Sequence, residues 1–249
     1  MTETITSKSN PRLKEVRKLH DRKHRERTGL FIAEGEDMLA AALNHGRVPE
    51  TVLITPDFEL PGLPGEVEVL SVSPDALASA GSLGSGSRVL GIWEERSADL
   101  ESPSLYLHDV ADPGNVGTIL RAAEAFGAGQ VVLSPHTADP FGPKAVRASM
   151  GAIFGQPVVR ASWAETRAAS DFAVALVPGE GSPLRELPLP RSPLFVLGAE
   201  RTGLPPQIAS ACDHVAHIPV GEPGSLNVAM TATLCLYEYS RRAPQARST

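Results

Sequence analysis

Apolar and polar positions in the first part of the chain follow a pattern in which helical and extended segments alternate. After an Asn-Pro pair, the apolar residues Leu13, Val16 and Leu19 recur at a spacing of three, which predicts a helix that begins with a capping residue and a proline. EDMLAAALNHG predicts a second helix that ends at its glycine. FIAEG, TVLIT, EVEVLSV and RVLGIW are short runs that we expect to be extended. These elements predict a small α/β domain over residues 1–95.

A different pattern begins at residue 105, where continuous apolar runs alternate with helical segments. We expect strands at LYLHDV, QVVLS, PVV, FAVALV, PLFVLG and HVAHIPV. We expect helices at GTILRAAEAFG, at residues 144–150, at SWAETRAAS, after Pro205 and from about Leu226 to Arg241. Apolar strands that alternate with helices are typical of a parallel sheet with both faces covered. The sequence therefore predicts a second α/β domain over residues 105–249, joined to the first by a polar linker over residues 96–104.

Composition places the chain among soluble globular proteins with two modest domains. Its 249 residues are 42% hydrophobic and 21% charged, and no apolar run approaches the roughly 20 residues that span a bilayer. We expect no membrane segment and no secretory signal. Cys212 and Cys235 lie far apart without the spacing of metal ligands, and the seven histidines include no HExxH motif. A cytoplasmic protein without a metal centre is expected.

The net charge of −6 conceals a strong asymmetry along the chain. Residues 1–27 contain nine Lys or Arg residues and four acidic residues, a balance of +5, so the remaining residues carry −11. A local basic cluster on an acidic body is typical of a protein that contacts phosphate groups. The alternative, from charge alone, is a solvated amphipathic helix without a specific partner.

Three segments in the second half of the chain each join an apolar strand to a loop rich in glycine or proline. They are DVADPGNVGTILRAAEAFGA from residue 109, FVLGAERTG from residue 195 and IPVGEPGSLNVAMTATLCLYE from residue 218. Loops that follow buried strands are where α/β proteins place ligands and chemistry. The candidate site residues in these segments are Asn115, Arg121, Glu200, Ser225 and Asn227.

Each of these residues also has a purely structural interpretation. Asn115 could cap the helix that follows it, with Arg121 in solvent, and Glu200 could be an acid at a helix start. Ser225 is a good N-cap, whereas Asn227 is less easily explained inside a helix. The residues alone leave these alternatives open.

The three segments resemble the signature motifs of the SpoU (TrmH-like) branch of the SPOUT RNA methyltransferases. The resemblance extends from about Leu105 to Tyr239, and PKAVRASMG at residues 143–151 is similar to the family's segment between the first and second motifs. TSKSNPRLKEVRKLHDRKHRERTGLFIAEGEDML resembles the substrate-binding domain that precedes the enzyme core in many ribosomal RNA members. Ala199 departs from the family, which more often has Asn there, but the Glu200 position is intact.

This resemblance implies a C-terminal parallel-sheet SPOUT domain with a deep trefoil knot, preceded by a smaller α/β RNA-binding domain. The knot would form from about Phe195 to the end of the chain. The implied cofactor is S-adenosylmethionine, held by the loops at Leu197, Gly198, Ile218 and Leu226. The family also forms homodimers through the knot domain, which implies that Arg121 of one protomer lies near the methyl donor bound to the other.

The implied activity is transfer of a methyl group to a ribose 2′-hydroxyl, and the N-terminal domain favours 23S ribosomal RNA as the substrate. In this family the residue that matches Arg121 is the proposed activator of the hydroxyl, while the residues that match Asn115, Glu200, Ser225 and Asn227 complete the site. A guanidinium stays protonated at ordinary pH. Arg121 is therefore better suited to stabilising the developing oxyanion while an RNA phosphate takes the proton, unless a strong local field lets it act as the base.

RNA itself is expected to bind through a set of cationic side chains. These candidates are Arg12, Lys14, Arg22, Arg25 and Arg147. Arg147 could equally be a helix-surface residue. The alternatives for the whole chain are a tRNA ribose 2′-O-methyltransferase and a non-catalytic RNA-binding SPOUT protein.

Overall fold

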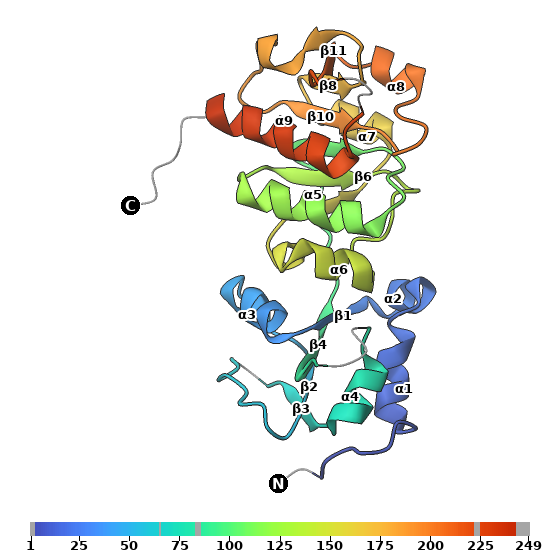
Figure 1. Cartoon of the computed structure of the whole chain (residues 1–249), viewed down its shortest axis with the longest axis vertical. Helices are drawn as coiled ribbons and strands as arrows, with labels where there is room; N and C mark the ends of the chain where they lie inside the picture. The colour runs from blue at the N-terminus through green and yellow to red at the C-terminus, as the bar shows by residue number, and fades with distance from the viewer. Residues whose placement is uncertain (1–2, 65, 83–85, 222–224, 243–249) are drawn as a thin grey trace. The chain divides into compact units, whose positions relative to one another are not determined.

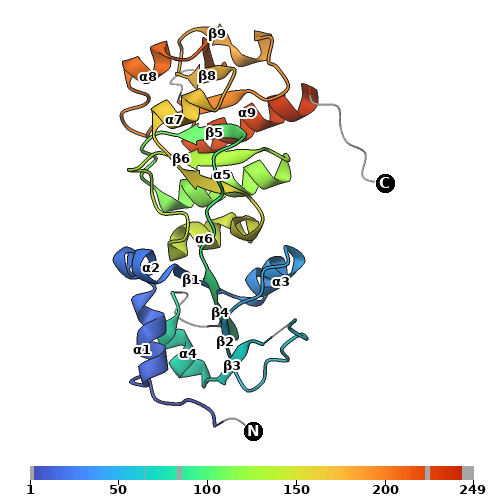
Figure 2. The ribbon, with the colours of Figure 1, turned by 180° about the vertical axis from the view of Figure 1, so that it is seen from behind.

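The structure is a computed structural model that describes residues 3–64, 66–82, 86–221 and 225–242. The chain forms two compact units. The first comprises Met1–Arg96 together with Asp139–Gly155, and the second comprises Ser97–Ala138 together with Gln156–Thr249. The elements of both units are visible from one side in Figure 1 and from behind in Figure 2.

The first unit is built on a four-stranded sheet with the strand order β1-β4-β2-β3. β4 pairs antiparallel with β1 and β2, and β2 pairs parallel with β3. The strands are β1 (Leu30–Glu34), β2 (Thr51–Ile54), β3 (Glu68–Ser71) and β4 (Val89–Glu94). The helices are α1 (Pro11–Lys18), α2 (Arg22–Thr28), α3 (Glu36–Asn44), α4 (Pro74–Ala80), α6 (Pro143–Ser149) and the 3₁₀ turn η1 (Ala152–Phe154).

α1 and α4 cover one face of this sheet. α1 begins as its Asn-Pro pair predicts, because the Asn10 side chain accepts a hydrogen bond from the Arg12 amide (2.8 Å). Leu13, Val16 and Leu19 are all buried, and they share one core with apolar side chains of α4, β1, β2 and β4. The spacing of three therefore marks the buried stripe of α1.

The opposite face of the sheet carries a cluster of aromatic rings. Phe31 and Trp93 are cross-strand partners on β1 and β4. Phe141 and Phe154 lie against them, and the ring centroids of the contacting pairs are 4.9–6.2 Å apart, a favourable range for aromatic packing. The segment over residues 139–155 thus contributes to the core of the first unit, although it interrupts the sequence of the second.

The second unit contains a seven-stranded, all-parallel sheet with the strand order β7-β6-β5-β10-β8-β11-β9. The strands are β5 (Pro103–Leu107), β6 (Gln130–Leu133), β7 (Val158–Arg160), β8 (Ala173–Leu176), β9 (Ser182–Pro183), β10 (Leu194–Leu197) and β11 (His214–His217). The helices are α5 (Pro113–Ala125), α7 (Trp163–Ala168), α8 (Pro206–Ser210), α9 (Val228–Arg242) and the 3₁₀ turn η2 (Leu184–Glu186).

Helices cover both faces of the parallel sheet. α5 and α9 lie side by side on one face (Figure 1), and α7 and α8 lie on the other (Figure 2). On the α7–α8 face, Tyr106 and Val196 form part of a core with Ile208 and Trp163. The predicted α/β fold with a covered parallel sheet is confirmed, and the continuous apolar character of the strands follows from burial on two sides.

The structure differs from the expected organisation in two helices and in the limits of the compact units. The short helices α2 and α4 were not anticipated. The domain limits 1–95, 96–104 and 105–249 remain a prediction, but the compact units differ from them because residues 139–155 group with the first unit. The trefoil knot also remains a prediction. Within the described ranges, no helix is long and apolar enough to cross a membrane.

Candidate active site

The candidate residues come from loops at neighbouring strand ends. β10 lies between β5 and β8, and β8 lies between β10 and β11, so the carboxyl ends of these four parallel strands meet at one edge of the sheet. All three motif segments leave the sheet at this edge. Open α/β sheets bind ligands at the carboxyl ends of their strands.

The first motif enters α5 through Asp112 rather than Asn115. The Asp112 side chain accepts a hydrogen bond from the Gly114 amide (2.7 Å), so Asp112 is the N-cap. Asn115 lies in the first turn of the helix. The interpretation of Asn115 as a capping residue is therefore wrong, because the cap is already occupied and the Asn115 amide is left to bind elsewhere.

Glu200, in the second motif, forms hydrogen bonds with the loop of the first motif. One of its carboxylate oxygens accepts hydrogen bonds from Asn115 Nδ2 (2.7 Å) and from the Asp112 amide (3.3 Å), and the other accepts from the Ala111 amide (3.2 Å). Partial burial raises the pKa of the carboxyl, but the hydrogen bonds from Asn115 and from backbone amides outweigh it and hold the pKa below the ordinary value. Glu200 is thus an ionised acceptor that fixes the orientation of Asn115.

Asn227 extends this network to the third motif. Its Nδ2 donates to Asn115 Oδ1 (3.1 Å), and its Oδ1 accepts from the Ala229 amide (2.8 Å). α9 begins at Val228, so Asn227 makes the capping interaction that had been assigned to Ser225, and that assignment is wrong. The hydrogen-bonded series Glu200–Asn115–Asn227 joins all three motifs in one unit.

A cavity of about 500 Å³ opens beside this network. Its walls include the four residues expected to hold a cofactor, Leu197, Gly198, Ile218 and Leu226. Glu200 and Ser225 line the same cavity. The structure therefore brings the predicted cofactor residues together with two of the predicted catalytic ones.

The cavity depends on a close backbone approach at the end of β10. A Cβ atom built on Gly198 would come within 2.2 Å of the Gly203 carbonyl carbon, and the Gly203 amide donates to the Ala199 carbonyl (2.9 Å). The loop between these residues therefore folds back tightly over the strand end. A side chain at position 198 would force the loop away from the strand.

Comparison with known proteins agrees with this arrangement. Residues 102–237 match the SpoU rRNA methylase family, and residues 10–90 match the MRM3-like substrate binding domain. The chain belongs to the SpoU rRNA methylase family. A 23S rRNA (guanosine(2553)-2′-O)-methyltransferase of Bacillus subtilis is 30% identical over 94% of this chain and 97% of its own length. A 23S rRNA (uridine(2479)-2′-O)-methyltransferase of Streptomyces viridochromogenes is 30% identical over 92% and 89%.

Solved structures of SpoU and rRNA methyltransferases share the whole fold. The AdoMet-bound rRNA methyltransferase of Sinorhizobium meliloti superposes with a TM-score of 0.84 at 30% identity, over 96% of this chain and 98% of that one. The SpoU methyltransferase AviRb of Streptomyces viridochromogenes, in complex with AdoMet, gives a TM-score of 0.82 at 28% identity, over 93% and 97%. Both neighbours hold S-adenosylmethionine, the cofactor that the motifs implied.

Arg121 stands apart from the hydrogen-bonded series in this SpoU-family chain. It is exposed on α5, it has no hydrogen-bond or ion-pair partner among the described residues, and it is not among those that line the cavity. A free guanidinium on the helix that carries Asn115 is available to a bound substrate.

The cations expected to bind RNA divide into exposed and buried members. Arg12 and Arg22 are exposed but each pairs with an acid, Arg12 with Glu68 and Arg22 with Glu26 (2.8 Å). Lys14 and Arg147 are exposed and have no partner in the described part of the chain. Four of the five candidates thus present charge to solvent.

Arg25 is the exception, because it is buried and the prediction that it binds RNA is wrong. Only 3% of the residue is exposed, and its guanidinium donates to the Leu19 carbonyl (2.7 Å) and to Asp139 (2.5 Å). Asp139 belongs to the same compact unit. Arg25 therefore joins α2 to the segment that contains α6, and its burial keeps it from contact with a phosphate group.

One wall of the cavity was not predicted from the sequence. Leu176, Pro178 and Glu180 line it from the end of β8, and the Glu180 carbonyl is 3.0 Å from His217 Nδ1. The run FAVALV followed by PGEG has the same form as the three motifs, an apolar strand before a glycine- and proline-containing loop. That pattern could have identified this fourth loop, but the loop carries fewer conspicuous polar residues.

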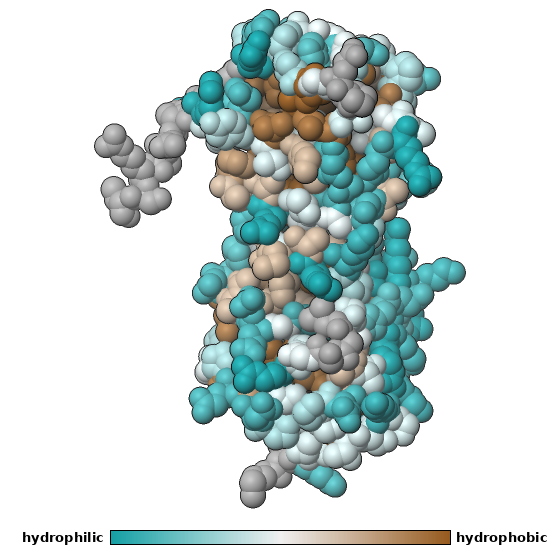
Figure 3. Space-filling view, in the orientation of Figure 1, coloured by the Kyte–Doolittle hydropathy of each residue, from teal (hydrophilic) through white to brown (hydrophobic). Residues whose placement is uncertain are grey.

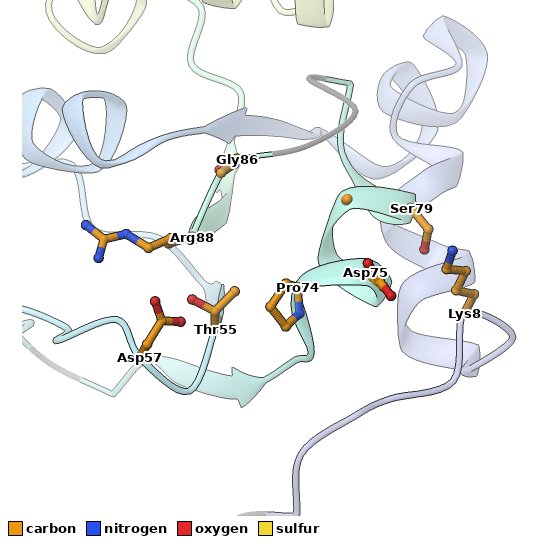
Figure 4. A pocket seen from close by; sticks show the side chains of 10 residues that line it. Lys8, Thr55, Asp57, Pro74, Asp75, Ser79, Gly86 and Arg88 are labelled. Carbon is orange, nitrogen blue, oxygen red and sulfur yellow. The ribbon is translucent and has the colours of Figure 1, made fainter.

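A second cavity, of about 460 Å³, lies within the first unit (Figure 4). Lys8 and Arg88 line it together with Asp57 and Asp75, so its charges balance. Arg88 is also committed to Glu36, with 2.7 Å between Nη2 and the carboxylate. These walls offer no excess of positive charge for a phosphate group.

Cys212 and Cys235 are both free thiols. Burial raises the pKa of both thiols, that of Cys212 to about 12. In the part of the chain that the structure describes, no group of three or more His, Cys, Asp or Glu side chains is arranged to hold a metal ion.

Proposed function

We propose that this chain is an S-adenosylmethionine-dependent methyltransferase that modifies a ribose 2′-hydroxyl in 23S ribosomal RNA. The observation that carries the proposal is the Glu200–Asn115–Asn227 series at the edge of the cavity lined by Leu197 and Ile218. Family membership and two relatives named as 23S rRNA 2′-O-methyltransferases support the same reaction.

The cavity fits S-adenosylmethionine in size, and its walls combine apolar and polar groups. Ligand pockets are typically about 300–1,000 Å³ and place polar groups among apolar walls. Here Leu197, Ile218 and Leu226 supply apolar surface, and the tight turn at Gly198 brings backbone groups to the wall. When bound, this cofactor supplies an activated methyl group on a sulfonium. The protein's contribution to the reaction is then largely the positioning of the ribose.

The Glu200–Asn115–Asn227 series positions the side chains that contact the ribose. Because Glu200 is ionised and accepts from Asn115, the Asn115 amide is fixed with its oxygen towards Asn227. Ser225, at the cavity wall, presents a hydroxyl beside them. In this proposal Arg121 holds a phosphate of the target nucleotide and stabilises the negative charge that develops on the 2′-oxygen. The proton of the hydroxyl leaves to an RNA phosphate oxygen.

The separation of Arg121 from the cavity lining supports a homodimer with shared sites. α9 exposes Met230, Leu234 and Tyr237, at 60%, 38% and 47%, at the spacings that place residues on one helix face. Figure 3 shows apolar side chains gathered on the side of the second unit that carries α9. We assign this face to the contact between two copies, which would bring Arg121 of each copy to the cavity of the other.

A mixture of two inactive variants tests the shared site. Arg121→Ala removes the guanidinium, and Ile218→Arg fills the cavity with a cation that repels the sulfonium. In a mixed dimer with shared sites, one site regains both an intact Arg121 and an intact cavity, so activity returns on mixing. Continued inactivity of mixed dimers, verified by native mass spectrometry, would contradict the shared site without contradicting the reaction.

The substrate is tested by methyl transfer from labelled S-adenosylmethionine into separate pools of deproteinised ribosomal RNA, assembled ribosomal subunits and tRNA. The proposal expects label in a ribosomal pool, consistent with an enzyme that acts in the cytoplasm. Label in tRNA alone would make the chain a tRNA methyltransferase. Cofactor binding without transfer to any pool would favour an RNA-binding SPOUT protein without turnover.

A further inference from the structure

Met150 combines two unusual properties in the turn that follows α6. Its φ angle is +50°, in the left-handed region that residues other than glycine, asparagine and aspartate rarely adopt. It is also 55% exposed, so its side chain gains little from the core of the first unit. A rarely adopted backbone conformation at a residue whose side chain is more than half exposed points to a functional use of that side chain.

The surrounding structure holds this turn rigidly. Gly151 follows with a φ of +99°, and a Cβ atom on it would come within 2.4 Å of Ala41 Cβ, so the turn lies directly on α3. On one side of the turn Asp139 is bound to buried Arg25, and on the other Phe154 packs in the aromatic cluster. The exposed side chain of Met150 therefore projects from a turn whose backbone is held in place.

The neighbouring charge indicates what this side chain meets. Arg147 is one helical turn earlier, where its carbonyl accepts from the Met150 amide (3.2 Å), and its own side chain is exposed and without a partner in the described ranges. An apolar side chain beside a free guanidinium matches a nucleotide, whose base presents an apolar face next to a phosphate. A protein partner needs a larger apolar patch, whereas the other large hydrophobic residue exposed among the described residues of this unit is Val48.

We infer that Met150 packs against a base of the ribosomal RNA substrate while Arg147 binds the adjoining phosphate. This inference rests on the proposed function, and it adds a recognition element outside the motif loops. The thioether is flexible and polarizable, so it can adapt to any base. Because the turn is already rigid, binding costs little backbone conformational entropy.

Photo-methionine tests the contact directly, because the chain has four methionines. The labelled protein is irradiated with unmodified 23S rRNA transcript, and the cross-linked peptides are identified by mass spectrometry. RNA attached at Met150 is the expected result, with buried Met38 as the negative control. Cross-links from Met150 to a second copy of the chain, or no RNA at Met150, would overturn the inference. Methyl transfer by unlabelled protein, measured in parallel, reports separately on the proposed function.

A substitution that relieves the strain separates recognition from folding. Met150→Asn suits the left-handed backbone, so the melting temperature should rise while the Kd for the same transcript increases about tenfold, a loss of about 1.4 kcal/mol. Val48→Asn is the matched control and should leave the RNA affinity unchanged. An unchanged RNA affinity in a folded Met150→Asn protein would overturn the inference, even if wild-type protein methylates the RNA.

Discussion

The motif loops and the basic N-terminal segment are both rich in polar side chains, and the fold uses them differently. In the loops, Glu200, Asn115 and Asn227 bind one another and remain at the surface beside a cavity. In the segment over residues 1–27, Arg12 and Arg22 pair with exposed acids, and Arg25 is buried against Asp139. The polar groups of the loops form one site, whereas those of the basic segment divide between the fold and solvent.

This difference explains why polar residues in strand-end loops predict a site better than a count of charges does. A loop at the carboxyl end of a parallel strand has its place fixed by the sheet, so its polar residues meet those of neighbouring loops. A count of charges has no such constraint. It cannot distinguish a cation that meets RNA from one that neutralises an acid within the same unit.

The largest effect is expected from Arg121→Ala in the motif region. Removing the guanidinium should lower kcat by about 10²–10⁴-fold, because charge on the ribose oxygen is no longer stabilised, while the Kd for S-adenosylmethionine stays nearly unchanged. Single-turnover transfer and calorimetric titration measure the two quantities. Arg185→Ala, another exposed arginine of the second unit, is the control. Equal losses of turnover and donor affinity would refute the role given to Arg121.

In the basic segment, Arg25→Ala should lower the stability of the fold. The substitution leaves Asp139 without its partner in a largely buried position, at a cost of about 3–5 kcal/mol of unfolding free energy. Denaturant unfolding measures the change. Arg12→Ala, which breaks an exposed pair, should cost no more than about 1 kcal/mol. Similar small losses for both variants would remove the distinction between a structural and a surface cation.

Glu200→Gln should have a smaller effect, because the amide retains one acceptor. We expect kcat to fall about tenfold, the equivalent of one hydrogen bond to a charged group. The pKa of Glu200 is lowered in the fold, so its ionised form contributes stability above the unfolded-state pKa and loses it as pH falls below about 4.5. Thermal unfolding from pH 7 to pH 3 should show that the difference between wild type and variant shrinks in acid. A difference that is constant over this range would show that the carboxylate charge is unimportant.

Lys14→Ala should have the smallest effect. As an exposed cation without a partner among the described residues, it should change stability by less than about 0.5 kcal/mol. Its loss should weaken RNA binding and reduce the slope of log K against log salt by about one. Filter binding across a salt series measures this slope, and an unchanged slope would exclude Lys14 from the RNA contact.

Point variants are better suited to these questions than deletion of residues 1–95. Deletion would leave Phe141 and Phe154 without Phe31 and Trp93, because all four share one cluster. The truncated protein would expose this apolar surface, and a loss of RNA affinity would then have two explanations.

The sequence predicted the sheet and the motif loops because both leave local marks. Apolar runs identify the strands of the second unit, and glycine, proline and lone polar residues identify the loops. The membership of Phe141 and Phe154 in the first unit has no such mark, because it depends on pairing with rings more than forty residues away in the chain. The cap at Asn227 was missed for a related reason, since Asn227 also binds Asn115, a residue 112 positions away in the chain.

The position of the transferred methyl group tests the central claim most directly. Wild-type protein is incubated with labelled S-adenosylmethionine and ribosomal RNA, and the RNA is then hydrolysed in alkali. A 2′-O-methyl group blocks cleavage of its own phosphodiester, so the account predicts that the label is recovered in an alkali-stable dinucleotide. Label recovered in a mononucleotide would place the methyl group on a base and contradict the account.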